Sequence, residues 1–483
     1  MLPQTPSKFI VIFVIGLGVA YAPLATGQVV ESTLPPGPPE AMTLSTVVYL
    51  PSVTRNYQPG YVSPFGIIMY SNVDDEAGLP QMQTAGSRRV TTLLFWSEIE
   101  ALPPVGDQHS YTWTSFDAKV SNASAAGMQV FVLFTGNPPW AASCPGGPVY
   151  PQHVPNLVAF VTVLAERYDG DGSDDAPGSP VVNDWSFYAE PDNGEEWRCA
   201  AQGKGFWGNN GAGFAEMLSN IAPAIHNASP NARVMIGGIA YDWFTEEGGP
   251  FVRSFLADTL QALNGNHGGA LNYIDAVAFH YYPISTARWP TIREKALEIK
   301  GIMSQNGLDH LPLLAPEVGY WSDPAAGSSE ARQARFLVQM YARGLSVGIE
   351  HLSWFRVFDD GPLTEQHGLF WGSNLADPKL AYDAYRIMTG ELYGASYASP
   401  LAASGVEGYV FTMSNGSEKT VLWSTVNPST LMPFGETCLR KVETLGTEQS
   451  VVDGGSLDED GVANGQISLE VYLDQPNYVG SCN

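Results

Sequence analysis

The chain has 483 residues, of which 44% are hydrophobic and 15% are charged, and its formal net charge at pH 7 is −26. This length and composition fit one large globular domain joined to a smaller one. A surface of this sign repels nucleic acid and anionic membranes and disfavours polyanionic substrates, so no nucleic-acid partner is expected.

The N-terminal residues are typical of an export signal. Lys8 is followed by the apolar run FIVIFVIGLGVA, which is too short to span a membrane comfortably. The sequence therefore predicts a signal peptide over residues 1–27 and a secreted protein, with a retained membrane anchor as the alternative. Residues 28–60 are rich in proline, serine and threonine, which predicts a linker.

Short apolar runs alternate with helical patterns across residues 61–394. Most of these runs are continuously apolar, as expected of strands that are covered on both faces. The eight candidate strands are FGIIMY (65–70), VTTLLFW (90–96), MQVFVLF (128–134), VNDWSFYA (182–189), RVMIGGI (233–239), IDAVAFHYY (274–282), LPLLAPE (311–317) and IEHLSWF (349–355). Eight strands with intervening helices predict an α/β fold, a TIM (β/α)8 barrel. The rival, a doubly wound open sheet, usually has a glycine-rich turn after its first strand, and MYSNVDDEAG is not one.

The helical patterns stop before residues 395–483. GVEGYVFTMSNGSEKTVLWST and GQISLEVYLD alternate in hydrophobicity, with glycine and asparagine turns between strands. This pattern predicts a small antiparallel β-sandwich. We expect it to pack against the barrel, with carbohydrate binding as the alternative.

The chain contains four cysteines, and none of them forms a CxxC motif or a Cys/His cluster. No metal site is therefore expected, and no cofactor is implied by the sequence. Cys144 follows the third candidate strand and Cys199 follows the fourth, so adjacent loops bring them together. Cys438 and Cys482 both lie in the sandwich segment. In an exported chain this arrangement predicts the disulfides Cys144–Cys199 and Cys438–Cys482.

Two carboxylates follow strands on roughly opposite sides of the predicted barrel. Glu190 ends the fourth strand and Glu317 ends the seventh. Catalytic residues of such barrels project from the carboxyl ends of strands, and a carboxyl pair can cleave a glycosidic bond. Further side chains at strand ends are predicted to contact a sugar, because aromatic faces stack on sugar rings: Trp96, Trp140, His280, Tyr282 and Trp354.

These residues give the chain a specific resemblance over about Phe65 to Leu392. The stretch FWSEIEALPPVGDQHSYTWTSFDAKVSNASAAGMQVFVLFTGNPPW resembles clan A of the glycoside hydrolases between strands two and three. These are retaining (β/α)8 enzymes, and the chain is most similar to the group that contains the β-xylosidase/α-iduronidase family.

The resemblance implies a role for each matching residue. Glu190 would be the acid/base and Glu317 the nucleophile. Tyr282, with Tyr281 as the second candidate, would hydrogen-bond the nucleophile, and Trp354 would form the floor of the sugar subsite. Two features depart from the clan's pattern: Ala189 stands where an asparagine usually precedes the acid/base, and no arginine lies within residues 90–96.

The sequence thus predicts a secreted, monomeric retaining glycoside hydrolase that cleaves a neutral β-linked oligo- or polysaccharide with two glutamates. The alternative, from another functional class, is a catalytically silent barrel that binds glycan at a cell surface.

Overall fold

The computed structural model describes residues 63–194, 206–283, 287–359 and 366–482, which all belong to one compact unit, Gln58–Asn483. The predicted signal peptide (1–27) and linker (28–60) lie outside these residues. No helix within the described ranges is long and apolar enough to cross a membrane.

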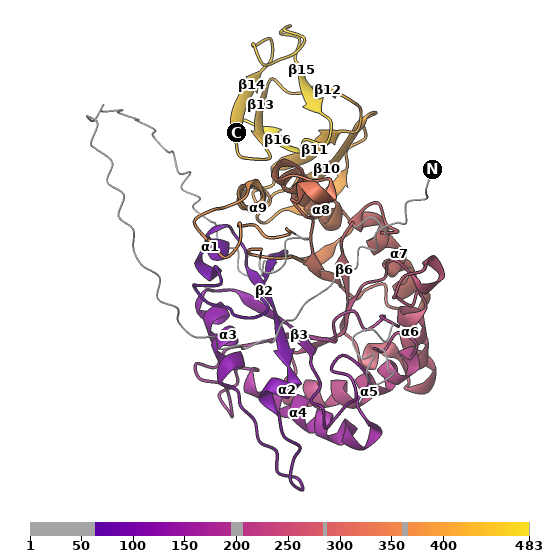
Figure 1. Ribbon diagram of the computed structural model, residues 1–483. Coiled ribbons are helices and arrows are strands. Elements are labelled where there is room, and N and C mark those ends of the chain that lie inside the picture. Colours follow the sequence, from indigo (N-terminus) through magenta and orange to yellow (C-terminus); the bar gives the residue numbers. More distant parts are fainter. Residues whose placement is uncertain (1–62, 195–205, 284–286, 360–365, 483) are drawn as a thin grey trace, which may run out of the picture. The chain divides into compact units, whose positions relative to one another are not determined.

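Eight parallel strands close into a barrel in sequence order, which confirms the predicted fold class (Figure 1). Each strand pairs with the next one in the chain, and β1 pairs with β8. The strands are β1 (Phe65–Ile68), β2 (Arg89–Phe95), β3 (Gln129–Thr135), β4 (Asp184–Phe187), β5 (Arg233–Ile239), β6 (Ala276–Tyr281), β7 (Leu313–Val318) and β8 (Ile349–Trp354).

Helices surround the barrel and cover the outer face of its strands. In α4, for example, Leu157, Phe160, Val161 and Leu164 form a buried stripe at helical spacing. The helices are α1 (Leu79–Thr84), α2 (Trp96–Ile99), α3 (Thr114–Ala125), α4 (Val154–Arg167), α5 (Gly211–Ala228), α6 (Phe255–Asn266), α7 (Ile292–Gln305), α8 (Glu330–Ser346) and α9 (Leu380–Glu391). Short 3-10 turns are η1 (Pro151–His153), η3 (Thr245–Glu247), η4 (Ala270–Asn272) and η5 (Pro324–Ala326).

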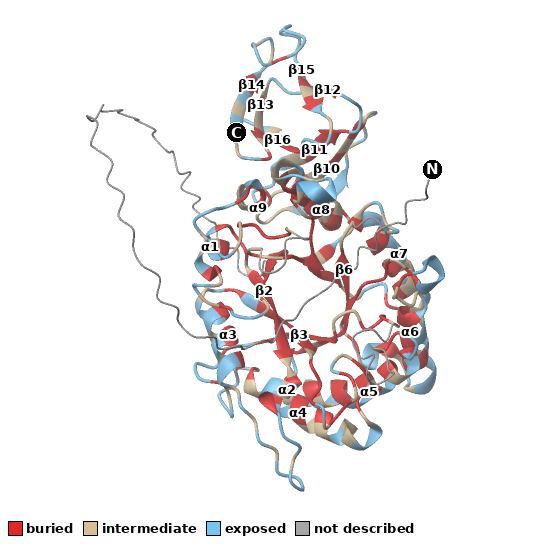
Figure 2. Cartoon of the chain, in the orientation of Figure 1, coloured by how far each residue is buried: buried red, intermediate tan, exposed pale blue. Residues whose placement is uncertain are grey.

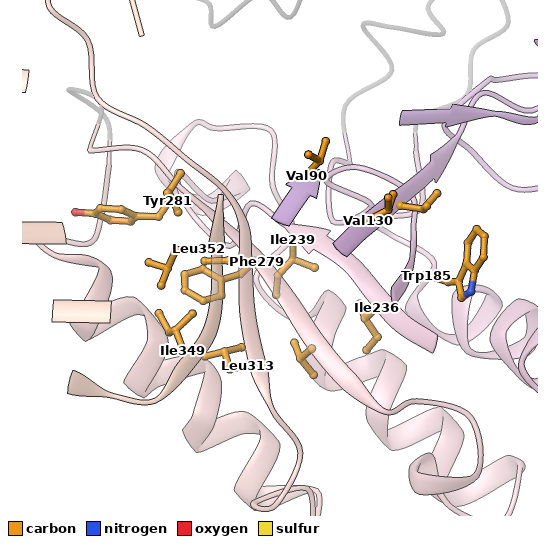
Figure 3. Packing of buried hydrophobic residues seen from close by; sticks show 14 of the residues in the cluster. Val90, Val130, Trp185, Ile236, Ile239, Phe279, Tyr281, Leu313, Ile349 and Leu352 are labelled. Atoms are coloured by element: carbon orange, nitrogen blue, oxygen red, sulfur yellow. The ribbon is translucent and has the colours of Figure 1, made fainter. Parts of the chain in front are cut away.

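The barrel strands are buried on both faces, as their continuous apolar runs predict (Figure 2). Outward-facing side chains such as Phe279 and Leu352 belong to the large core between strands and helices (Figure 3). A second cluster, formed by Phe131, Met235, Ala276, Ala278 and Leu314, fills the barrel interior. Because side chains alternate along a strand, Ala276, Ala278 and His280 of β6 share the inward face. The strand itself therefore aims His280 into the barrel.

Charged side chains, of which Arg89 and Asp184 are buried, pair at the amino ends of β2, β4, β5 and β8. Arg89 is only 2% exposed and its guanidinium lies 3.2 Å from the Asp184 carboxylate. Arg233 bridges Asp184 at 2.7 Å and Glu350 at 2.9 Å. Two cations thus offset two carboxylates, which a buried charge requires. The arginine of β2 is consequently engaged at the end of the barrel away from the carboxyl ends of the strands.

The C-terminal region is a separate antiparallel domain, as predicted. A six-stranded sheet has the order β14-β13-β16-β11-β10-β9, and β12 pairs with β15. The strands are β9 (Ser396–Pro400), β10 (Val406–Thr412), β11 (Glu418–Ser424), β12 (Ser429–Phe434), β13 (Cys438–Glu443), β14 (Glu448–Val452), β15 (Ile467–Tyr472) and β16 (Asn477–Ser481). Arg343 of α8 makes two 2.7 Å hydrogen bonds to Glu407 of β10, which ties this domain to the barrel.

One predicted disulfide is confirmed, since Cys438 and Cys482 are bonded with their Cα atoms 5.5 Å apart. Cys144 is also disulfide-bonded. Its predicted partner, Cys199, lies outside the described residues, so that pairing stays a prediction.

Removing the Cys438–Cys482 bond should destabilise the sandwich. The two cysteines are 44 residues apart in sequence. Without the bond the unfolded chain gains conformational entropy, which lowers the free energy of unfolding by about 4 kcal/mol for a loop of that size. We expect the double variant Cys438→Ala/Cys482→Ala to unfold at a lower temperature by calorimetry. An unchanged unfolding midpoint would show that the bond does not constrain the unfolded chain.

Candidate active site

Glu190 and Glu317 meet at the carboxyl ends of the barrel strands. Glu190 lies three residues beyond β4, and Glu317 is the penultimate residue of β7. One carboxylate oxygen of each and a ring nitrogen of His280 lie within 4.8 Å of one another. The side chain of Glu317 is 3% exposed and that of Glu190 is 17% exposed. Three ligand atoms at this spacing could also hold a cation, as could the carboxylates of Asp169, Asp171 and Asp175.

His280 lies between the two carboxylates. Its Nδ1 is 3.2 Å from Glu190 Oε1 and 3.8 Å from Glu317 Oε1. Among the described residues its buried Nε2 has no hydrogen-bond partner. We therefore assign the proton of the neutral ring to Nδ1, where it is donated to Glu190. Burial alone would lower the pKa of His280, but the Glu317 and Glu190 carboxylates outweigh it and raise the pKa.

The chain after β4 has a strained backbone. Tyr188 has a φ of 64° and Glu190 a φ of 48°, although Glu190 precedes Pro191. Non-glycine residues rarely adopt such values, and a following proline disfavours them further. Strain of this kind persists only when neighbours fix the conformation.

Strand β5 and the loop that follows it supply those neighbours. The Glu190 N–H donates to the Gly238 carbonyl at 2.9 Å. The buried Asp192 carboxylate accepts from the N–H groups of Ala240 at 2.9 Å and Tyr241 at 2.7 Å. Burial raises the pKa of Asp192 to about 7, although these two bonds act against the shift. Asp192 thus fixes the segment that carries Glu190.

Glu317 accepts hydrogen bonds from two tyrosines, one on each oxygen. The Tyr282 hydroxyl donates to Oε1 at 2.8 Å, and the Tyr70 hydroxyl donates to Oε2. Tyr281, the second sequence candidate, points away, and its hydroxyl donates to the Pro290 carbonyl at 3.2 Å. Among the described residues, His280 is the one basic side chain within 4.0 Å of Glu317. Sequence reasoning missed Tyr70, although it lies two residues beyond β1 and the rule of strand ends would have found it.

The predicted tryptophans do not join this group. Trp96 is fully buried, stacks on Phe160 with ring centroids 5.6 Å apart and donates to Glu100 at 2.9 Å. Trp140 is partly buried and packs edge-on against Trp96 at 5.2 Å. Trp354 is also fully buried, and its N–H donates to the His367 carbonyl at 2.9 Å. Neither Trp96 nor Trp354 presents a free face to a ligand in this structure. Trp96 begins α2, which turns its indole toward α4 rather than the mouth of the barrel.

No family model and no curated protein matches the chain. Solved structures do match it. A family 39 glycoside hydrolase from the gut symbiont Bacteroides cellulosilyticus WH2 superposes with a TM-score of 0.64 and 16% identity, covering 86% of this chain and 80% of its own. A glucosidase from Croceicoccus marinus has a TM-score of 0.59 and 15% identity over 86% and 94% of the two chains. A β-xylosidase from Caulobacter crescentus has a TM-score of 0.57 and 14% identity over 87% and 96%. The resemblance to (β/α)8 glycoside hydrolases that the sequence indicated is thus confirmed at the level of the fold.

Proposed function

We propose that the protein is a retaining glycoside hydrolase with Glu190 as the acid/base and Glu317 as the nucleophile. The observation that carries the proposal is the meeting of the two carboxylates. Oxygen atoms from the ends of β4 and β7 lie within 4.8 Å of each other. Retaining enzymes hold their carboxyl groups about 5–5.5 Å apart, whereas inverting ones leave about 6.5–9.5 Å for a water molecule. The fold shared with glycoside hydrolases supports the same reading.

The first step forms a covalent glycosyl-enzyme. A carboxylate oxygen of Glu317 bonds to the anomeric carbon while the glycosidic C–O bond breaks. The Glu190 carboxyl gives its proton to the departing oxygen, so the leaving sugar departs as an alcohol. His280 donates to Glu190 and so fixes the orientation of that carboxyl.

The second step releases the sugar with retained configuration. The Glu190 carboxylate takes a proton from a water molecule, whose oxygen bonds to the anomeric carbon. The bond between that carbon and Glu317 breaks, and Glu317 recovers its charge. Both carboxyl groups then return to their starting protonation states.

The charges of the protein favour a neutral substrate. Glu190, Asp192 and Glu317 lie together in a chain of net charge −26, and this field repels an anionic sugar. The preference for a β-linkage rests on the resemblance. Secretion is supported by the Cys438–Cys482 bond, because disulfides persist in oxidising compartments.

A test must separate hydrolysis from glycan binding without turnover. We expect the purified protein to release aryl alcohol from at least one neutral β-glycoside in a panel, and proton NMR of early time points to show the retained β-anomer. The double variant Glu190→Gln/Glu317→Gln, purified in parallel, controls for a contaminating hydrolase. Inverted product would exclude the retaining mechanism. Calorimetric binding of oligosaccharides without any product would favour the silent glycan-binding alternative.

A further inference from the structure

The second oxygen of the nucleophile accepts a hydrogen bond from Tyr70, which lies two residues beyond the first strand. We propose that Tyr70 is a further catalytic residue, whose hydroxyl acts on Oε2 of Glu317 and speeds the release of the sugar from the enzyme. The inference rests on the proposed retaining mechanism. It assigns to Tyr70 a chemical task that differs between the two steps.

Two neutral hydroxyl groups, which follow different strands, donate hydrogen bonds to the Glu317 carboxylate. Tyr70 follows β1 and Tyr282 follows β6, so their hydroxyls reach Oε2 and Oε1 from two sides. Both rings rest on Phe355, with centroids 6.0 Å and 5.9 Å from it. Burial and the neighbouring Glu317 charge raise the pKa of both phenols well above the usual value. Both hydroxyls therefore keep their protons and remain donors.

The backbone of Tyr70 is fixed independently of Glu317. Its carbonyl accepts a 2.8 Å hydrogen bond from Lys119 Nζ and a 3.4 Å contact from Thr92 Oγ1. Lys119 lies on α3, is 7% exposed and also donates to the Leu93 carbonyl of β2 at 3.2 Å. Tyr70 is thus anchored to β2 and α3 before any substrate binds, as a preorganised donor must be.

The two steps use this donor differently. In the resting enzyme and in the second transition state, Glu317 carries full or developing negative charge, which a phenol O–H stabilises. In the covalent intermediate the same carboxyl is a neutral ester and accepts a weaker bond. Removing the donor therefore destabilises the departing carboxylate relative to the intermediate. The second step should slow more than the first, because the first starts from a carboxylate that has lost the same stabilisation.

The change Tyr70→Phe tests this directly, because it removes one oxygen atom and keeps the ring on Phe355. With a substrate that carries an activated aryl leaving group, we expect the kcat of Tyr70→Phe to be about 10²-fold lower than that of the wild-type enzyme. KM should fall with it, so that kcat/KM changes much less, and stopped-flow assays should show a burst of aryl alcohol equal to the enzyme concentration. Tyr385→Phe is the matched control, since it removes a buried phenol that donates to the Gly66 carbonyl of β1 at 3.0 Å. Its kcat and KM should match those of the wild type.

The outcomes separate this inference from the proposed function. Wild-type kinetics in Tyr70→Phe, or an equal fall of kcat and kcat/KM without a burst, would overturn the role of Tyr70 and leave the hydrolase intact. A wild-type protein that turns over no glycoside would overturn both. Should Tyr70→Phe fail to fold, site-specific 3-fluorotyrosine at position 70 gives a stronger donor of nearly the same shape. We then expect no burst and a kcat at least equal to that of the wild type, and a lowered kcat would contradict the inference.

Discussion

Replacing Glu317 with alanine is expected to lower kcat/KM by about 10⁴-fold, and Glu190→Ala should lower it as far only for substrates with a poor leaving group; azide is expected to restore turnover with opposite stereochemistry in the two variants. In Glu317→Ala, azide fits the space of the missing carboxylate and attacks from that face, so the glycosyl azide has inverted configuration. In Glu190→Ala, a substrate with a good leaving group still forms the intermediate on Glu317, and azide displaces it with overall retention. NMR of the two products therefore identifies each role.

Glu98→Ala is the matched control for these variants. Glu98 is an exposed glutamate on α2, outside the site. It should keep the wild-type rate, and azide should not change it. The same product configuration from both glutamate variants would contradict a double displacement. Opposite configurations in the reverse assignment would exchange the roles of Glu190 and Glu317.

The barrel was predictable because its signal is repeated eight times. Each strand is a short apolar run, and a strand that is buried on both faces tolerates few polar residues. The bounds of the strands were predicted less accurately, since β6 begins at Ala276 in the structure and at Ile274 in the prediction. The rule that the carboxyl ends of parallel strands gather on one face was enough to bring Glu190, His280, Tyr282 and Glu317 together without knowledge of any distance.

Side-chain direction beyond a strand end was not predictable. Trp96 and Glu190 both follow strands, yet the indole turns outward against Phe160 while the carboxylate faces Glu317. The difference lies in backbone dihedrals, since Glu190 has a positive φ and Phe95, before Trp96, is extended. Composition and periodicity do not encode such values for residues other than glycine. Tyr70 was missed for a simpler reason, because a tyrosine at the end of an apolar run is typical of the hydrophobic core.

The pair Gly237–Gly238 in β5 has a use that only the structure explains. A Cβ at Gly238 would overlap the imidazole of His280, with Nε2 as the nearest atom. A Cβ at Gly237 would overlap the carbonyl oxygens of Phe187 and Tyr188. The glycines therefore let β5 lie directly beside the end of β4 and leave room for His280. The Gly238 carbonyl also accepts a hydrogen bond from the Glu190 N–H. Gly238 therefore leaves space for the His280 ring and also fixes the backbone of Glu190, the two partners of one hydrogen bond.

Gly238→Ala should consequently damage both activity and stability. The methyl group must displace the His280 ring or shift β5, and overpacking of this kind costs about 1–3 kcal/mol. A shift of His280 by about 1 Å would misplace the Glu190 carboxyl and lower kcat about 10²-fold. Denaturant unfolding and steady-state kinetics measure the two effects. Gly301→Ala is the matched control, since Gly301 lies in α7 with open space at its Cβ position. It should keep full activity and gain up to about 1 kcal/mol from helix propensity.

A double-mutant cycle with His280→Ala identifies the source of the damage. The smaller side chain at position 280 leaves space for the methyl group, so Gly238→Ala should then cost less than about 0.5 kcal/mol. The further loss of kcat should likewise disappear, because the displaced imidazole is already absent. If Gly238→Ala costs the same stability in both backgrounds, the methyl group strains β5 itself. His280 would then not be the reason why glycine occupies this position.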